Sequence, residues 1–123
     1  MLNEGMVFAT VAVKNLEESK KFYAETLGLR QVDENIGGVM YESGGSKVFI
    51  YESPSAGTNR ATSATWSVDD IEAVVEELKK NGITFEHYDF PGFEQNGDIM
   101  DAGGMKTAWF KDPTGNILAV VNK

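Results

Sequence analysis

Apolar and polar residues follow two different periods along the first half of the chain, and each change of period marks an expected element. Residues 6–13 are β-prone and alternate between two faces, which predicts a strand. A helix is expected over residues 16–26, because Asn15 can cap it and Glu18, three residues later, completes a capping box. Gly28 is expected to end this helix. Short strands are then predicted at about 29–33, 39–42 and 47–52.

The same succession begins again after a polar segment at residues 53–62, which carries Pro54 and Gly57 and is expected to be a linker. A strand is predicted at 64–68, followed by a helix capped by Asp69 or Asp70. The apolar residues of that helix keep the i, i+3, i+4, i+7 spacing of one helical face: Ile71, Val74, Val75 and Leu78. Next come a stop at Asn81-Gly82, a strand over 84–90 and a long acidic loop over 91–102.

The chain ends in a hairpin whose turn is expected at Asp112-Pro113-Thr114-Gly115. Proline fixes the φ of the second turn residue, and glycine accepts the left-handed backbone that closes the turn. If residues 112 and 115 close the hairpin, Phe110 faces Ile117 and Ala108 faces Ala119.

Comparison of the chain with itself shows an internal repeat. Val68 falls on Val13, and Gly82 falls on Gly28, at nearly the same offset. Neither half could bury its sheet alone, so the two must pair, either within one chain or across a dimer. The order of elements predicts an α+β fold of one domain, residues 1–123, with helices on the outer sheet faces and a cleft on the other side.

Composition limits the function classes. The chain has 123 residues, a net charge of −8 and no cysteine, so disulfides, thiolate ligands and a cysteine nucleophile are excluded. An acidic chain is not expected to bind nucleic acid or an anionic membrane, whereas it is compatible with a cationic ligand. No signal peptide and no apolar run of membrane-spanning length are seen, and a cytoplasmic location is expected.

Strand alternation places a set of aromatic and hydroxyl side chains on the face expected to line the cleft. The expected ligand-binding residues are Phe8, Thr10, Phe49, Tyr51, Ser63, Thr65, Phe110 and Ala119, with Ser67 and Ile117 beside them and Lys47 and Lys106 near the strand ends. Trp66 and Trp109 have the opposite parity, and the facing of Tyr41 stays open. The alternative is that these residues fill a closed core.

The chain resembles the vicinal oxygen chelate superfamily, which includes glyoxalases, bleomycin resistance proteins and dioxygenases. The resemblance rests on VKNLEES at 13–19, Phe22-Tyr23, LGL at 27–29, VDDI at 68–71, NGI at 81–83 and WFKDPTGN at 109–116. It implies two βαβββ modules, about 6–52 and 63–123, whose curved mixed sheets surround a ligand cleft. It also implies a homodimer.

In metal-dependent relatives, four inward-facing strand positions carry His or Glu. The resemblance assigns these positions to Phe8, Ser63, Ala119 and either Phe49 or Tyr51. None of these side chains is a good ligand for a divalent metal, so no metal and no cofactor are expected. The only histidine, His87, is expected to be exposed or hydrogen-bonded in a structural role.

Three functions remain open at this stage. The leading one is a metal-independent binding protein, like bleomycin resistance proteins, that sequesters an aromatic or cationic small molecule. The second is an enzyme that uses Tyr51, Glu42 or loop carboxylates for acid–base chemistry. The third is a partner-binding module without a ligand. The loop at 91–102, with Glu94, Asp98 and Asp101, is either a solvated acidic loop or a lid over a basic ligand.

Overall fold

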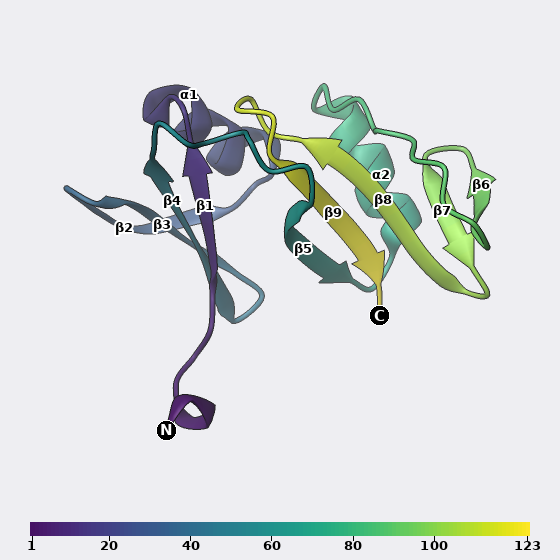
Figure 1. Cartoon of the computed structure of the whole chain (residues 1–123), viewed down its shortest axis with the longest axis horizontal. Coiled ribbons are helices and arrows are strands. Elements are labelled where there is room, and N and C mark those ends of the chain that lie inside the picture. Colours follow the sequence, from purple (N-terminus) through teal and green to yellow (C-terminus); the bar gives the residue numbers. More distant parts are fainter. The chain divides into compact units, whose positions relative to one another are not determined.

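The computed structural model describes all residues, 1–123, and the chain divides into two compact units (Figure 1). Unit one comprises Met1–Asn59 with Pro113–Asn116, and unit two comprises Arg60–Asp112 with Ile117–Lys123. Each unit holds one mixed, curved sheet and one α-helix, so the predicted α+β class is confirmed. The boundary at residues 59 and 60 falls within the segment 53–62 expected as a linker.

Unit one has a four-stranded sheet in the order β1-β4-β3-β2, in which β1 and β4 are parallel and the other pairs antiparallel. A short 3₁₀ helix, Leu2–Glu4, precedes the sheet, and a π-helical turn, Phe22–Thr26, extends the α-helix. The other elements are β1 (Ala9–Val13), α1 (Leu16–Lys21), β2 (Arg30–Asn35), β3 (Gly38–Ser43) and β4 (Ser46–Glu52).

Helix α1 and the π-helical turn after it together span the residues 16–26 predicted as one helix, with the predicted cap at Asn15. The Asn15 side chain accepts a hydrogen bond from the backbone N–H of Glu18 at 3.0 Å, which satisfies one of the free donors of the first turn. Gly28 ends the helical segment with a φ of +75°, a conformation that costs glycine little.

One face of the first sheet is covered by α1. Tyr23 and Tyr41 are fully buried and stack with ring centroids 6.1 Å apart, and the Tyr41 hydroxyl donates to the carbonyl of Lys20 at 3.3 Å. Tyr41, whose facing the sequence left open, therefore belongs to the helix side. The buried strand residues of this face are Val11, Val13, Val39, Val48 and Ile50.

Unit two has a five-stranded sheet in the order β5-β9-β8-β7-β6, in which only β5 and β9 are parallel. None of the helices in either unit has the length and apolarity needed to cross a membrane. The elements of unit two are β5 (Thr62–Val68), α2 (Ile71–Lys80), β6 (Glu94–Asn96), β7 (Ile99–Ala102), β8 (Met105–Lys111) and β9 (Ile117–Asn122).

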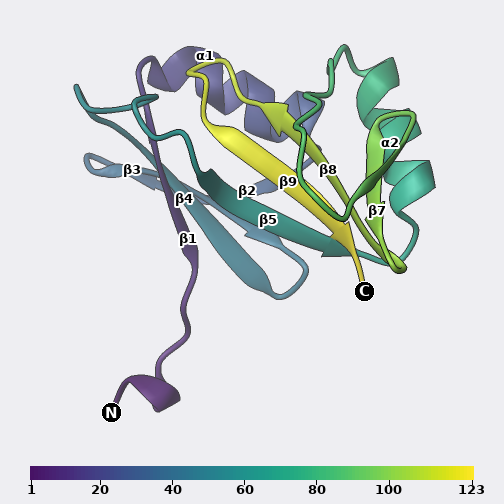
Figure 2. The same cartoon turned by 45° about the vertical axis from the view of Figure 1, so that its right-hand side comes forward.

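Helix α2 covers one face of this sheet and contacts β8 and β9, as Figures 1 and 2 show. Asp70 rather than Asp69 caps it, accepting from the backbone N–H of Ala73 at 3.1 Å. Of the predicted apolar stripe, Ile71, Val75 and Leu78 are buried and Val74 is partly exposed. Sequence periodicity was sufficient here because one amphipathic helix packs on one sheet face.

The region between α2 and β8 differs from the prediction. The strand expected over 84–90 is wrong: only Glu86 pairs with the sheet, through one bridge to Trp109. The loop expected over 91–102 is also wrong, because it contains the hairpin of β6 and β7. β7 takes the place beside β8 that a strand at 84–90 would have occupied, which leaves residues 84–90 largely unpaired.

Candidate functional site

The face of the first sheet opposite α1 carries an aromatic pair. Strand alternation on β4 turns Phe49 and Tyr51 to this side, and their rings lie nearly parallel, at 14°, with centroids 6.2 Å apart. Both side chains are partly exposed. Thr10 on β1 and Met40 on β3 flank Phe49 in the sheet register. The structure thus brings together three of the predicted residues, Thr10, Phe49 and Tyr51.

Gly38 makes room for this pair. A Cβ atom at Gly38 would lie 2.8 Å from Cζ of Phe49 and would collide with the carbonyl oxygen of Ile50. The Phe49 ring therefore lies directly over the backbone of the neighbouring strand. Phe8 precedes β1, continues the alternation that includes Thr10, and keeps 39% of its surface exposed.

The corresponding face of the second sheet centres on Ala119. In the register, Ala119 on β9 lies between Thr65 on β5 and Trp109 on β8. Thr65 is exposed, whereas Ala119 is only 2% exposed. Ser63 lies at an irregularity of β5 between Thr62 and Ala64. Two of the predicted residues, Thr65 and Ala119, are therefore direct neighbours on one face.

The predicted register of the last hairpin is wrong by one residue. β8 ends at Lys111, which pairs with Ile117, so five residues rather than four form the connection. Asn116 belongs to the turn, where its side chain donates to the carbonyl of Ala12 at 2.7 Å. Because side chains alternate along a strand, one extra turn residue exchanges the two faces of β8.

Two of the predicted pocket residues move to the helix side as a result. Phe110 pairs with Leu118, is 1% exposed and packs edge-on against Phe85, with centroids 5.8 Å apart. Lys106 forms an ion pair with Glu72 of α2 at 2.6 Å. Trp109, which the sequence placed on the opposite parity, takes the place predicted for Phe110.

Trp109 belongs to an aromatic cluster of unit two that the sequence did not reveal. Its ring contacts Tyr88 and Phe90, with centroids 5.4 and 5.5 Å away, and Phe90 in turn contacts Phe93. The indole N–H donates to the Thr62 hydroxyl at 3.2 Å. The bridge between Glu86 and Trp109 brings this cluster together, and a single bridge leaves no periodic pattern in the sequence.

A sequence profile of the Glyoxalase/Bleomycin resistance protein/Dioxygenase superfamily matches residues 5–120. The chain belongs to this superfamily. No protein of curated function matches the sequence significantly. Membership confirms the resemblance seen in the motifs, although the superfamily includes proteins of several different activities.

Solved structures with the same fold include both binding proteins and enzymes. TnmS3, an antibiotic binding protein from Streptomyces sp. CB03234, is 20% identical with a TM-score of 0.71, over 95% of this chain and 93% of that one. A glyoxalase family protein from Enterococcus faecalis is 22% identical (TM-score 0.74, 98% and 99% covered). Lactoylglutathione lyase from Agrobacterium tumefaciens is 14% identical (TM-score 0.70, 96% and 93% covered).

The residues of this chain do not fit the metal site known from this superfamily. The positions assigned to it hold Phe8, Ser63, Ala119 and Phe49 or Tyr51, whose side chains offer two hydroxyl groups and no carboxylate, imidazole or thiolate. Nowhere in the structure do three His, Cys, Asp or Glu side chains gather in a way that could hold a metal ion.

The resolved pKa shifts of carboxylates and lysines belong to ion pairs on the surface. Asp98 takes part in two of these surface interactions: its carboxylate lies 2.8 Å from Nε2 of His87 and 3.1 Å from Nζ of Lys79 on α2. The pKa of Asp98 lies below its ordinary value of 3.8, chiefly because of the hydrogen bond with His87. Burial opposes this lowering, and the hydrogen bond and charge of Lys79 add to it. His87 thus has the hydrogen-bonded role expected for it.

We expect Asp98→Asn to destabilise the protein by about 1 kcal/mol at pH 7, since it removes the carboxylate that forms an ion pair with Lys79 and a hydrogen bond with His87. A lowered carboxyl pKa stabilises the folded state above pH 3.8, and this contribution is lost as the pH falls through the lower folded-state value. Urea titrations from pH 7 to pH 2.5 measure the difference. The difference should shrink as the pH falls below 3.8.

The control is Glu94→Gln, which removes the same charge from an exposed residue of β6 that has no ion-pair partner. Its effect on unfolding should be small at every pH. If Asp98→Asn and Glu94→Gln have the same pH profile, the cluster around Asp98 does not stabilise the fold.

Proposed function

We propose that this chain is a metal-independent binding protein that holds an aromatic or cationic small molecule against the sheet faces not covered by helices. The observation that carries the proposal is the Phe49–Tyr51 pair, whose parallel, partly exposed rings lie on the face opposite α1. Aromatic rings with one polar group give a flat ligand both contact area and orientation.

The second sheet supports the same proposal. Its face opposite α2 combines an indole ring, Trp109, with the small Ala119 and the exposed hydroxyl of Thr65. The likeness to TnmS3 adds a precedent for a protein of this fold that binds an antibiotic. The homodimer and the cytoplasmic location expected from the sequence remain parts of the proposal.

The proposed test begins with a thermal-shift screen of aromatic antibiotics and small aromatic amines, with and without divalent metals. A ligand that binds only the folded state raises the melting temperature in a concentration-dependent way. The shift should be the same in the presence of a chelator. A shift that requires an added metal would contradict the metal-independent mode.

Tyr51→Phe should weaken the binding of the compound found in the screen by about 0.5–1.5 kcal/mol, if the Tyr51 hydroxyl makes one neutral hydrogen bond to that compound. Titration calorimetry measures this change. The matched control is Tyr41→Phe, which removes a hydroxyl that bonds to Lys20 on the helix side. Unchanged binding in both variants, together with unchanged binding in Phe49→Leu, would show that the ligand does not contact this face.

No observation singles out the enzymatic alternative. Glu42, one of the groups considered for acid–base chemistry, lies in an exposed ion pair with Arg30 at 3.0 Å. Asp101, which lies on β7 in the segment expected to be an acidic loop, accepts a hydrogen bond from the backbone N–H of Gly104 in the turn between β7 and β8. Both arrangements are structural, so the binding function is the one we retain.

A further inference from the structure

A pocket opens in unit two where two successive chain segments, first residue 86 and then β7, lie beside β8. In unit one the corresponding place beside β3 is filled by a single strand, β2. In unit two Glu86 bridges to Trp109, with its N–H donating to the Trp109 carbonyl at 2.7 Å, and β7 takes over at residues 105–107. The chain between these two segments borders an open pocket of about 240 Å³.

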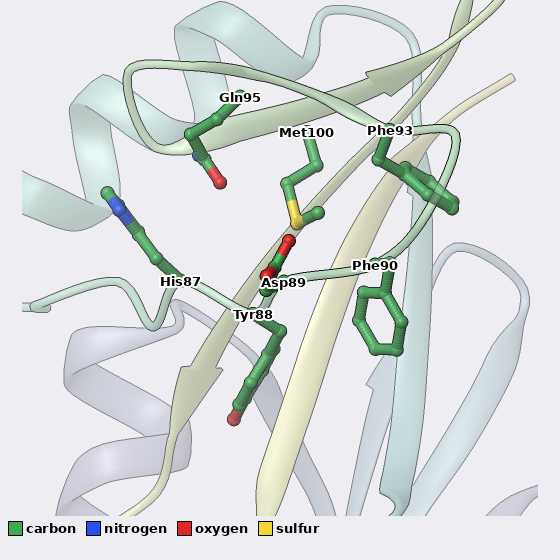
Figure 3. Close-up of a pocket in the computed structure, with 7 residues that line it drawn as sticks. All are labelled: His87, Tyr88, Asp89, Phe90, Phe93, Gln95 and Met100. Carbon is green, nitrogen blue, oxygen red and sulfur yellow. The ribbon is translucent and has the colours of Figure 1, made fainter.

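The lining of this pocket combines apolar and aromatic side chains with polar ones (Figure 3). Phe90 and Phe93 form one side, with ring centroids 5.9 Å apart and planes inclined at 55°. Met100, which is 3% exposed, lies between them and Gln95 in the view of Figure 3. Phe90 also contacts Trp109, but none of the seven lining residues is one that the sequence assigned to ligand binding.

Two polar side chains of the pocket, Asp89 and Gln95, offer it free hydrogen-bond acceptors. The other two are His87, whose Nε2 is bonded to Asp98 at 2.8 Å, and Tyr88. Asp89 lines it and has neither an ion-pair nor a hydrogen-bond partner, and Figure 3 shows its carboxylate near the centre of the pocket. The side-chain amide N–H of Gln95 donates to the carbonyl of Gly97 at 2.6 Å, which leaves its oxygen free. That oxygen points into the same space in Figure 3. No lysine or arginine lines the pocket.

We propose that this pocket binds a small organic cation: an amine carried on a flat apolar body. Aromatic faces attract a cation through their quadrupole, and a carboxylate without a partner supplies the opposite charge. The net charge of −8 raises the local concentration of cations around the chain. The cavity is smaller than a typical drug-binding pocket, so the ligand is a single ring with a short amine arm.

A neighbouring cavity of about 210 Å³ between α2 and the β6–β7 turn does not have this character. Its Asp98 is paired with Lys79 and His87, so its charge is already neutralised. The unpaired carboxylate distinguishes the pocket of Asp89 from it. The site is also independent of the Phe49–Tyr51 face, so either proposal can fail without the other.

The experiment compares three probes of similar shape: phenethylamine, 2-phenylethanol and 3-phenylpropionate, which are cationic, neutral and anionic at pH 7. Each is titrated into the ¹⁵N-labelled full chain and followed by NMR. Phenethylamine should bind most tightly and phenylpropionate most weakly. The amide signals that shift should belong to residues 87–100.

Asp89→Asn should lower the affinity for phenethylamine about fivefold, the equivalent of about 1 kcal/mol for one exposed charge pair. The affinity for 2-phenylethanol should stay unchanged. Glu94→Gln is the matched control, because it removes the same charge from a neighbouring residue outside the pocket. Along β6, Glu94 and Gln95 point to opposite faces of the hairpin. Phe93→Leu should weaken phenethylamine by loss of a ring face.

The proposal would be overturned by no saturable binding of phenethylamine, by equal affinities for phenethylamine and 2-phenylethanol, or by equal weakening of binding in Asp89→Asn and Glu94→Gln. If phenethylamine instead shifts the amide signals of Phe49 and Tyr51, this pocket is not the cation site, and the ligand face of the proposed function is supported.

Discussion

Replacing Phe110 with alanine is expected to lower the free energy of unfolding by about 3–5 kcal/mol, the usual cost of removing a fully buried phenylalanine. Phe110 is 1% exposed, its ring packs edge-on against Phe85, and it shares the helix side of the second sheet with Leu118. The cavity left behind would be enclosed on all sides, so relaxation could recover little of the loss.

The control for this prediction is Phe49→Ala on the first sheet, which removes an identical but partly exposed side chain and should cost less than about 2 kcal/mol. Urea unfolding, followed by the fluorescence of the two tryptophans, gives both values. The comparison tests the register directly. If Phe110→Ala costs no more than Phe49→Ala, Phe110 lies on a ligand face, as the four-residue turn would place it.

The sequence alone predicted most of what depends on local chemistry. The caps Asn15 and Asp70, the glycine stops and the apolar stripe of α2 are each set by residues within a few positions of one another. The same is true of β2, β3 and β4, whose glycine-rich turns separate them. Such features need no knowledge of the rest of the chain.

The register of the last hairpin could not be predicted in this way. Asp112-Pro113-Thr114-Gly115 satisfies the chemistry of a four-residue turn, and nothing adjacent to it signals a fifth residue. Asn116 belongs to the turn, where its amide bonds to Ala12, more than a hundred positions earlier, and Thr114 accepts from the N–H of Lys14. A contact so distant in sequence decided which side of β8 faces α2.

Half of the candidate site was therefore recognised and half was missed. The aromatic pair of β4 follows from alternation, because a fully paired strand with a buried opposite face keeps its phase. The pocket of Asp89 arises where two segments share one strand position, and neither segment has a regular period. The clue available in the sequence was the concentration of Tyr88, Phe90 and Phe93 beside Asp89, which a solvated loop would not need.

Gly38 is the position where the smallest substitution should have one of the largest effects. Its φ is +153°, and an added Cβ would meet the carbonyl of Ile50, the ring of Phe49 and Cβ of Tyr51. Two of these neighbours cannot move without separating β3 from β4. We expect Gly38→Ala to cost about 2–4 kcal/mol, from backbone strain and overpacking together.

Gly44→Ala is the control that separates these causes. Gly44 also has a positive φ, +53°, but an added Cβ would meet nothing within 4 Å. Its substitution should cost about 1 kcal/mol, from the left-handed backbone alone. The two melting temperatures and the near-ultraviolet circular dichroism of each variant measure the difference, since only Gly38→Ala should displace the stacked rings of Phe49 and Tyr51. Equal losses in both variants would mean that β3 shifts freely, so that Gly38 does not hold the aromatic pair in place.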